Sequence, residues 1–317
     1  MSRESGPTGD LVPPDPLRPE VLPRGRLGPG AVPRRPWRDD LRRIDDVRSA
    51  RTVGFALVQT VGVVAVAGWI GTWWAYLLAF VWMARGHALL NILGHEAAHR
   101  LLFSDRRVND LVGRWLLAFP TLQPFGVYRR AHLTHHRDEL GAAEPDTRLY
   151  AGYPIPRASW RRKLTRDACG VSAAKNLRAL ARAARRGDRD AIGIVLVQGL
   201  LLTIALLAGA GWAYVVWIGS WATLWKVSNR LRAVAEHGGM RHSEDRRATT
   251  HVVRQTRLAR LCLVPYNTGW HLAHHTDMGV PWHRLPALHA ELVGVGWVVP
   301  GLERPTYRAL WRAATRP

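Results

Sequence analysis

Two long apolar blocks interrupt an otherwise polar, arginine-rich chain of 317 residues. The first runs from Val53 to Leu93 and the second from Ala191 to Trp225. Each block is about twice as long as the roughly 20 apolar residues that one membrane-spanning helix needs. We therefore predict that each block crosses a membrane twice as a helical hairpin, with turns near Gly68–Thr72 and Ala208–Trp212. The predicted spans cover residues 53–70, 73–93, 192–209 and 212–228.

Two shorter apolar stretches do not fit a membrane span. The stretch Leu111–Val127 is short and contains Arg114, Pro120 and Pro124. Because lipid-exposed irregular backbone is excluded from the bilayer core, we interpret this stretch as interfacial or re-entrant. The run near Leu292–Val299 is interpreted in the same way. The predicted fold is an all-α integral membrane protein with four transmembrane helices in two hairpins and a helical cytoplasmic cap.

The sequence outside the apolar blocks divides into a tail, a cap and a C-terminal segment. Residues 1–45 are rich in proline, glycine and arginine and show no helical periodicity, which is typical of a disordered tail. Residues 46–290 form the expected membrane domain, whose polar cap comprises 94–190 and 229–290. Residues 291–317 are expected to form a C-terminal cytoplasmic segment.

The chain carries a formal net charge of +21, yet neither predicted hairpin turn contains Lys or Arg. Basic loops of membrane proteins face the cytoplasm, so we place both termini and the cap there. Such a charge also suits nucleic acid, but no RNA- or DNA-binding motif accompanies it, so we expect no nucleic-acid partner. The two cysteines, Cys169 and Cys262, lie in no metal-ligating pattern.

Three short clusters hold eight of the fourteen histidines: H-E-A-A-H at 95–99, H-L-T-H-H at 132–136 and H-L-A-H-H at 271–275. Residues i, i+3 and i+4 share one face of an α-helix, so each cluster presents its imidazoles as one patch. One zinc ion takes four ligands, whereas eight imidazoles suit two ions of a transition metal such as iron. The candidate ligands are His95, His99, His132, His135, His136, His271, His274 and His275.

The clusters also constrain the topology. A shared site requires that the chain between two clusters cross the membrane an even number of times. The second hairpin supplies two crossings between the second and third clusters, whereas a span over Leu111–Val127 would strand the second cluster on the far side. We therefore expect all three clusters on the cytoplasmic face of the membrane.

Longer motifs surround the clusters. They are R-G-H-A-L-L-N-I-L-G-H-E-A-A-H (85–99), E-P-D (144–146), A-E-H-G-G (235–239), P-Y-N-T-G-W-H-L-A-H-H (265–275) and V-P-W-H-R-L-P-A-L-H (280–289). With these motifs, residues 50–290 resemble the membrane fatty acid desaturases, a family of integral membrane di-iron desaturases and hydroxylases. The resemblance implies a ninth ligand, His237, because family members place a further histidine after the final span.

The resemblance implies an O₂-dependent oxidoreductase with two non-haem irons that leaves a C=C bond in an acyl chain. The expected substrate enters from the membrane lipid and is an acyl-lipid, an acyl-CoA or an acyl-carrier-protein. The sequence contains no flavin, haem or iron–sulfur motif, so a ferredoxin-type or similar carrier is expected to supply two electrons. Departures from the family's pattern leave the substrate and outcome open: they are Ala273, Thr276, Asp277 and Ala233.

Several charged residues near the clusters are candidates for roles beyond ligation. A metal-bound imidazole usually donates its other N–H to a carboxylate or carbonyl. The candidate carboxylates, each equally compatible with a solvated position, are Glu96, Asp146, Glu236 and Asp277. Arg85 and His87 lie inside the second predicted span, where they either line an acyl tunnel or anchor helix packing.

Three other functions are compatible with the sequence. A hydroxylase or ketolase would use the same di-iron site to oxygenate a lipid, an alkane or a carotenoid. An intramembrane zinc protease is a second alternative, because H-E-A-A-H matches H-E-x-x-H with Glu96 as the base, but it leaves six cluster histidines unused. A non-catalytic basic membrane scaffold would make no use of the histidines.

Overall fold

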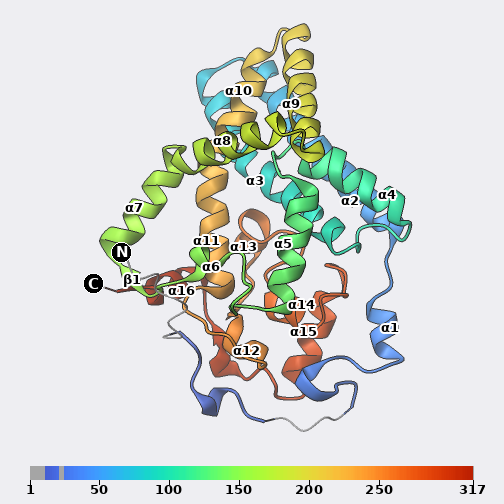
Figure 1. The fold of residues 1–317 in the computed structure, drawn as a ribbon, viewed down its shortest axis with the longest axis vertical. Helices are drawn as coiled ribbons and strands as arrows, with labels where there is room; N and C mark the ends of the chain where they lie inside the picture. Colours follow the sequence, from blue (N-terminus) through green and yellow to red (C-terminus); the bar gives the residue numbers. More distant parts are fainter. Residues whose placement is uncertain (1–10, 21–24, 317) are drawn as a thin grey trace. The chain divides into compact units, whose positions relative to one another are not determined.

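The computed structural model describes residues 11–20 and 25–316. The chain folds into two compact units, and each unit combines distant parts of the sequence. Unit 1 contains Arg130–Arg161 and the described parts of 1–44 and 230–317. Unit 2 contains Asp45–Arg129 and Arg162–Asn229. Helices make up most of unit 2 and are the main regular element among the described residues of unit 1 (Figure 1).

Unit 2 contains the long apolar helices. They are α2 (Asp46–Ile70), α3 (Trp73–Ala98), α9 (Arg189–Leu207) and α10 (Gly211–Ser220). A π-helical segment, η4 (Trp221–Trp225), joins α10 to α11 (Lys226–His237). Among the described residues, three segments are long and apolar enough to cross a membrane: Trp37–Ile70, Trp73–Ala98 and Arg189–Leu207. The predicted fourth span is helical, but η4 divides it.

Local sequence signals set the ends of these helices. Asp45 accepts a hydrogen bond from the backbone N–H of Arg48 and caps α2, and Asp188 caps α9 through Ala191 in the same way. Gly71 ends α2 with φ at 71°, a left-handed conformation that glycine adopts without steric cost. The connection between α2 and α3 is therefore a tight turn, as a hairpin requires.

Helix α3 packs against α2 and α10 and buries most of its second half. Two polar residues of α3 bind these neighbouring helices. Arg85 forms a hydrogen bond with Gln59 of α2, and the Nε2 of buried His87 lies 2.9 Å from the carbonyl oxygen of Trp217 in α10. Both contacts favour helix packing, one of the two roles that the sequence left open.

The stretch Leu111–Val127 is divided among three elements and is not one of the candidate spans. The elements are α4 (Arg106–Leu111), the π-helix η3 (Val112–Ala118) and α5 (Phe125–Arg137). Asp190 of α9 accepts a hydrogen bond from the backbone N–H of Gly126 and pairs with Arg114 at 3.2 Å. These contacts attach the stretch to α9 within unit 2.

Gly113 of η3 lies where a side chain does not fit. A Cβ atom at this position would be 2.5 Å from the Cβ of Ala97 and 2.8 Å from the Cζ of Phe125. We expect Gly113→Ala to lower the free energy of unfolding by about 1–3 kcal/mol, because overpacking forces neighbouring groups apart. Thermal unfolding of the purified protein measures the effect.

The matched control for this substitution is Gly54→Ala in α2, where no atom lies within 4 Å of the added Cβ. Alanine is more favourable than glycine in a helix by roughly 0.5–1 kcal/mol, so the control is expected to be at least as stable as the wild type. Equal melting temperatures for Gly113→Ala and the wild type would contradict the close packing of η3 on α3.

Unit 1 consists of short helices and two parallel pairs of two-residue strands among its described residues. The helices that lie wholly in unit 1 are η1 (Asp15–Leu17), η2 (Pro29–Ala31), α1 (Trp37–Leu41), α6 (Thr147–Tyr150), α12 (Arg246–Thr249), α13 (Arg257–Cys262), α14 (His271–Thr276), α15 (Leu285–Gly294), η5 (Pro300–Leu302) and α16 (Tyr307–Ala313). Strand β1 (Ile155–Pro156) pairs with β4 (Thr315–Arg316), and β2 (Val252–Val253) pairs with β3 (Glu303–Arg304). Helix α7 (Arg157–Ala168) leaves unit 1 and is followed by α8 (Val171–Arg185) in unit 2.

The N-terminal region differs from the disordered tail that its composition predicted. Residues 1–10 and 21–24 lie outside the described residues. In the described remainder, Leu27, Ala31 and Leu41 are buried in a core that includes residues of α14 and α15. Burial of these apolar side chains stabilises the proline- and arginine-rich chain around them. Part of this region therefore belongs to a hydrophobic core, although its composition is typical of a disordered tail.

Candidate metal centre

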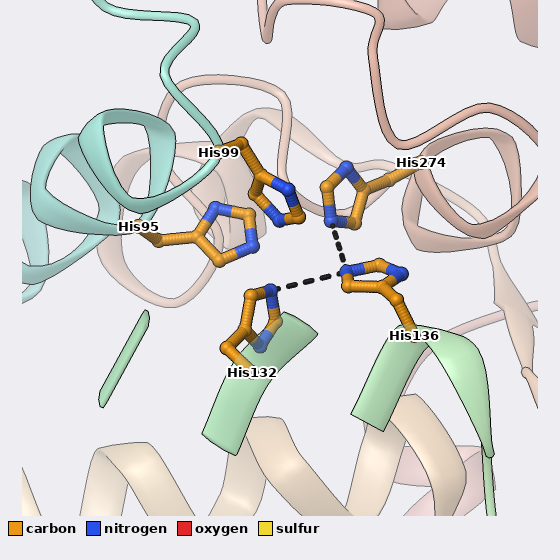
Figure 2. A group of neighbouring side chains, drawn as sticks. All are labelled: His95, His99, His132, His136 and His274. Atoms are coloured by element: carbon orange, nitrogen blue, oxygen red, sulfur yellow. Dashed lines mark hydrogen bonds between the residues drawn. The ribbon is translucent and has the colours of Figure 1, made fainter. Parts of the chain in front are cut away.

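The first histidine cluster lies at the end of α3 in unit 2. The rings of His95 and His99 are one helical turn apart, with centroids 4.7 Å from each other. Glu96 is buried, and its Oε1 lies 3.4 Å from the Nδ1 of His95. Both imidazoles point to the same side of α3 (Figure 2). The i, i+4 spacing thus produces the shared face expected from the sequence.

Unit 1 brings the other two clusters together with His237, the last residue of α11. The second cluster lies on α5 and the third on α14. Each of these helices divides its three imidazoles between two groups: the residues at i and i+4 join one group and the residue at i+3 joins the other. Group A contains His132, His136 and His274, and group B contains His135, His237, His271 and His275.

Group A brings three imidazole nitrogens close together. The Nε2 of His136 lies 3.1 Å from the Nε2 of His132 and 3.0 Å from the Nε2 of His274. Figure 2 shows the rings of these three residues converging from α5 and α14. Their candidate ligand atoms all lie within 4.8 Å of one another. One ion can therefore contact all three histidines.

Group B has the same arrangement. The Nε2 of His271 lies 3.0 Å from the Nε2 of His237 and 3.1 Å from the Nε2 of His275. The ligand atoms of His135, His237 and His275 lie within 4.8 Å of one another. The rings of His275 and His136 stack with centroids 4.3 Å apart, so groups A and B are adjacent.

These separations fit metal ligation. A histidine nitrogen lies about 2.1 Å from a bound transition metal, so two nitrogens at right angles to one ion are roughly 3.0 Å apart. The four Nε2 separations in groups A and B are 3.0–3.1 Å. Nitrogen-only donors favour a transition metal over magnesium or calcium. Each group can therefore hold one ion, and the two groups together form a candidate dinuclear site.

Burial favours the neutral form of several of these imidazoles. Burial lowers the pKa of His271 and of His275 well below the usual value, and it lowers the pKa of His274 to about 3. Burial also disfavours charge on His237, but a hydrogen bond to Glu139 raises the pKa of that ring. Because only an unprotonated nitrogen can bind a metal, the lowered pKa values suit ligation.

The Nδ1 atoms of group B face carboxylates, whereas several of its Nε2 atoms face one another. The Nδ1 of His135 lies 2.6 Å from the Oε2 of Glu144. The Nδ1 of His237 lies 3.2 Å from the Oε1 of Glu139, and the Nδ1 of His275 lies 3.1 Å from its Oε2. Carboxylates in these positions favour the tautomer with a proton on Nδ1, which leaves the Nε2 lone pair available to a metal.

Glu139 binds four partners in unit 1 and was not among the carboxylates predicted from the sequence. Besides His237 and His275, it accepts hydrogen bonds from the Oγ1 of Thr250 at 2.7 Å and from the Nη1 of Arg246 at 2.5 Å. Burial alone would raise the pKa of this carboxyl, but His275 and His237 hold the pKa well below its usual value. The available signal in the sequence was its position three residues after the last histidine of the second cluster.

Two of the predicted carboxylates lie close to group B. The Oε1 of Glu236 lies 3.9 Å from the Nδ1 of His271. The backbone N–H of Asp146 donates to the Oε1 of Glu144 at 2.9 Å, and burial together with the charge of Glu144 raises the pKa of Asp146. In the E-P-D motif, Glu144 is the residue whose carboxylate contacts His135.

Asp277 joins the third cluster to the N-terminal region. Its buried carboxylate pairs with Arg38 of α1 at 2.8 Å and also with Arg42. Burial would raise the pKa of Asp277, but hydrogen bonds from Arg42 and Arg38 lower it. The residue two positions after His275 therefore connects α14 to α1.

Comparison with known proteins relates this site to one family. The sequence model of the family described as "Fatty acid desaturase" matches residues 67–296. The matched region includes the three histidine clusters, His237 and Glu139.

Several desaturases are similar to this chain, among them the following three. Dihydrorhizobitoxine desaturase of Bradyrhizobium elkanii is 25% identical over 231 residues, and the match covers 67% of this chain and 66% of that protein. The sn-1 oleoyl-lipid 12-desaturase of Arthrospira platensis is 38% identical over 74 residues, or 22% of this chain and 21% of that protein. The temperature-sensitive sn-2 acyl-lipid omega-3 desaturase (ferredoxin), chloroplastic, of Arabidopsis thaliana is 31% identical over 102 residues, or 32% and 22%. The chain therefore spans just under two thirds of the first relative and about a fifth of the other two.

Proposed function

Since the chain belongs to the fatty acid desaturase family, we propose that it is an O₂-dependent desaturase that introduces a C=C bond into an acyl chain. The family consists of oxidoreductases. The observation that carries the proposal is the pair of all-histidine groups A and B, in which neighbouring Nε2 atoms are 3.0–3.1 Å apart. Two adjacent nitrogen-only sites suit two iron ions.

We assign nine histidines as ligands of the two irons. Groups A and B supply seven of them from unit 1. The other two lie at the end of α3, and they are assigned because of their motif and the family match. The proposed ligands are His95, His99, His132, His135, His136, His237, His271, His274 and His275.

Two irons, when bound, supply O₂-dependent abstraction of hydrogen from an unactivated C–H bond, which has no acidic proton for a side-chain base to remove. The protein holds the ligands in register for this chemistry. Glu139, Glu144 and the carbonyl oxygen of Thr249, which lies 2.9 Å from the Nδ1 of His237, keep protons on the Nδ1 atoms of three group B rings, so that the Nε2 atoms remain free to bind metal. A ferredoxin-type carrier is the proposed source of the two electrons, and the name of the Arabidopsis relative includes ferredoxin.

We propose a fourth membrane span at residues 212–228, which comprise α10, η4 and the start of α11. The three residues between α9 and α10 are a connection short enough for a hairpin. With four spans and basic residues outside the hairpin turns, both termini and all three histidine clusters lie on the cytoplasmic side.

Expression of the gene in a lipid-producing host tests the reaction. We expect new unsaturated fatty acids in the cells that carry the gene, detected by mass spectrometry with the double-bond position determined. The control is the same host with His135→Ala, because His135 lies in group B and is 2.6 Å from Glu144. The polar extract is profiled as well, because the Bradyrhizobium relative is named for dihydrorhizobitoxine.

The outcomes separate the alternatives. If all new products are hydroxylated or keto compounds, the reaction at this site is oxygenation and the proposed desaturation is wrong. A new double bond found only in a polar metabolite would support desaturation as the reaction but contradict an acyl chain as the substrate. Identical product profiles from cells that express the wild type and cells that express His135→Ala would contradict a metal-dependent reaction.

A further inference from the structure

Helix α8 in unit 2 has two unlike faces. On one face, Ala173 is buried with Trp221 and Trp225, and Leu177 follows one turn later with 40% of its surface exposed. The opposite face presents only basic charge, because α8 contains no Asp or Glu. Its exposed basic residues are Lys175, Arg178, Arg182 and Arg185. The protein therefore covers only part of the apolar face, while the basic face lies open.

The end of α8 adjoins the start of a candidate membrane span. Arg186 and Gly187 connect it to Asp188, which caps α9. Two more exposed basic residues, Arg186 and Arg189, lie at this junction. Figure 1 shows α8 running across the direction of α9 and α10. If α9 crosses a bilayer, α8 lies along the bilayer surface at the level of the lipid headgroups.

We propose that α8 is an interfacial helix that binds the phosphate groups of anionic phospholipids. Its basic face supplies charge-assisted hydrogen bonds to phosphate oxygens, and Leu177 contacts the acyl region below. A lipid fits better than an acidic protein because the uncovered apolar side chain and the covalent junction with α9 both place α8 against the bilayer. The inference concerns membrane attachment and is independent of the reaction at the metal centre.

Native mass spectrometry of the full chain purified in detergent tests the proposal. The probes are phosphatidylglycerol and phosphatidylcholine at equal concentration. We expect phosphatidylglycerol to be retained preferentially by the wild type. The triple variant Arg178→Gln/Arg182→Gln/Arg185→Gln is expected to weaken this retention about fivefold per arginine removed, or roughly a hundredfold in total, because each basic group near anionic lipid contributes similarly. Retention of phosphatidylcholine is expected to stay unchanged.

Two further variants locate the effect. Arg308→Gln/Arg312→Gln/Arg316→Gln removes the same charge from exposed positions on and after α16 and is expected to bind phosphatidylglycerol like the wild type. The variant Arg178→Lys/Arg182→Lys/Arg185→Lys keeps the charge and is expected to retain the lipid. Equal retention of both lipids by the wild type would overturn the proposal. So would a glutamine variant that keeps phosphatidylglycerol but loses binding to a reduced ferredoxin, because α8 would then serve an acidic protein.

Discussion

Replacing His136 with alanine is expected to remove iron from the protein and to abolish product formation. The Nε2 of His136 lies close to both other members of group A, at 3.1 Å from His132 and 3.0 Å from His274. Its ring also stacks on His275 of group B. Loss of an outer partner of a ligand already costs about 10–100-fold in metal affinity or activity, so loss of the ligand itself is expected to cost more than about a hundredfold.

Iron per chain, measured by elemental mass spectrometry of the purified protein, gives a readout that does not depend on turnover. The matched control is His289→Ala, because His289 is a partly exposed histidine of α15 outside groups A and B. This control is expected to keep the wild-type iron content. Full iron content in His136→Ala would contradict the assignment of group A, and one zinc without iron in the wild type would favour the zinc protease.

The second large effect is expected for Glu139→Gln, which keeps the shape of the side chain and removes its charge. The hydroxyl of Thr250, the guanidinium of Arg246 and the Nδ1–H of His275 can donate to this carboxylate. The Nδ1 of His237 lies 3.2 Å from it and 2.9 Å from the carbonyl oxygen of Thr249. Both carboxylate oxygens accept hydrogen bonds, whereas a glutamine amide has one oxygen and one NH₂ donor. At least one donor therefore loses its acceptor in a buried site, where such a loss is costly.

We expect the iron affinity of Glu139→Gln to fall about 10–100-fold. A chelator-competition experiment on the purified protein measures this affinity without any substrate. The matched control is Glu244→Gln, because Glu244 is exposed and its substitution removes the same charge. If Glu139→Gln lost melting temperature but kept the wild-type iron affinity, Glu139 would support the fold without positioning the ligands.

The local geometry of the candidate ligands could be predicted from the sequence because it depends on helical periodicity alone. His132 and His136 lie one turn apart on α5 with their Nε2 atoms 3.1 Å from each other. The turn between α2 and α3 also falls where Gly68–Thr72 predicted it, since the left-handed Gly71 lies within that range. Both features depend on residues within a few positions of one another.

The division into groups A and B could not be predicted in this way because it depends on long-range packing. His274 meets His136 from 138 residues away, and His275 shares Glu139 with His237. In the sequence, Glu139 is not distinguishable from a solvated carboxylate near the end of a helix. Its partners come from α11, α12 and α14, and the packing of these helices around it cannot be inferred from residue spacing.

The group A histidines are far apart in the sequence, so the ribosome completes them at different times. His274 is synthesised 138 residues after His136, which takes roughly 7–28 s at a typical rate of about 5–20 residues per second. During this interval the ribosome makes α9 and α10, and the second cluster has no partner on α14. If group A binds iron as proposed, iron that arrives early meets an incomplete chelate, and we expect metal insertion to follow translation of the third cluster.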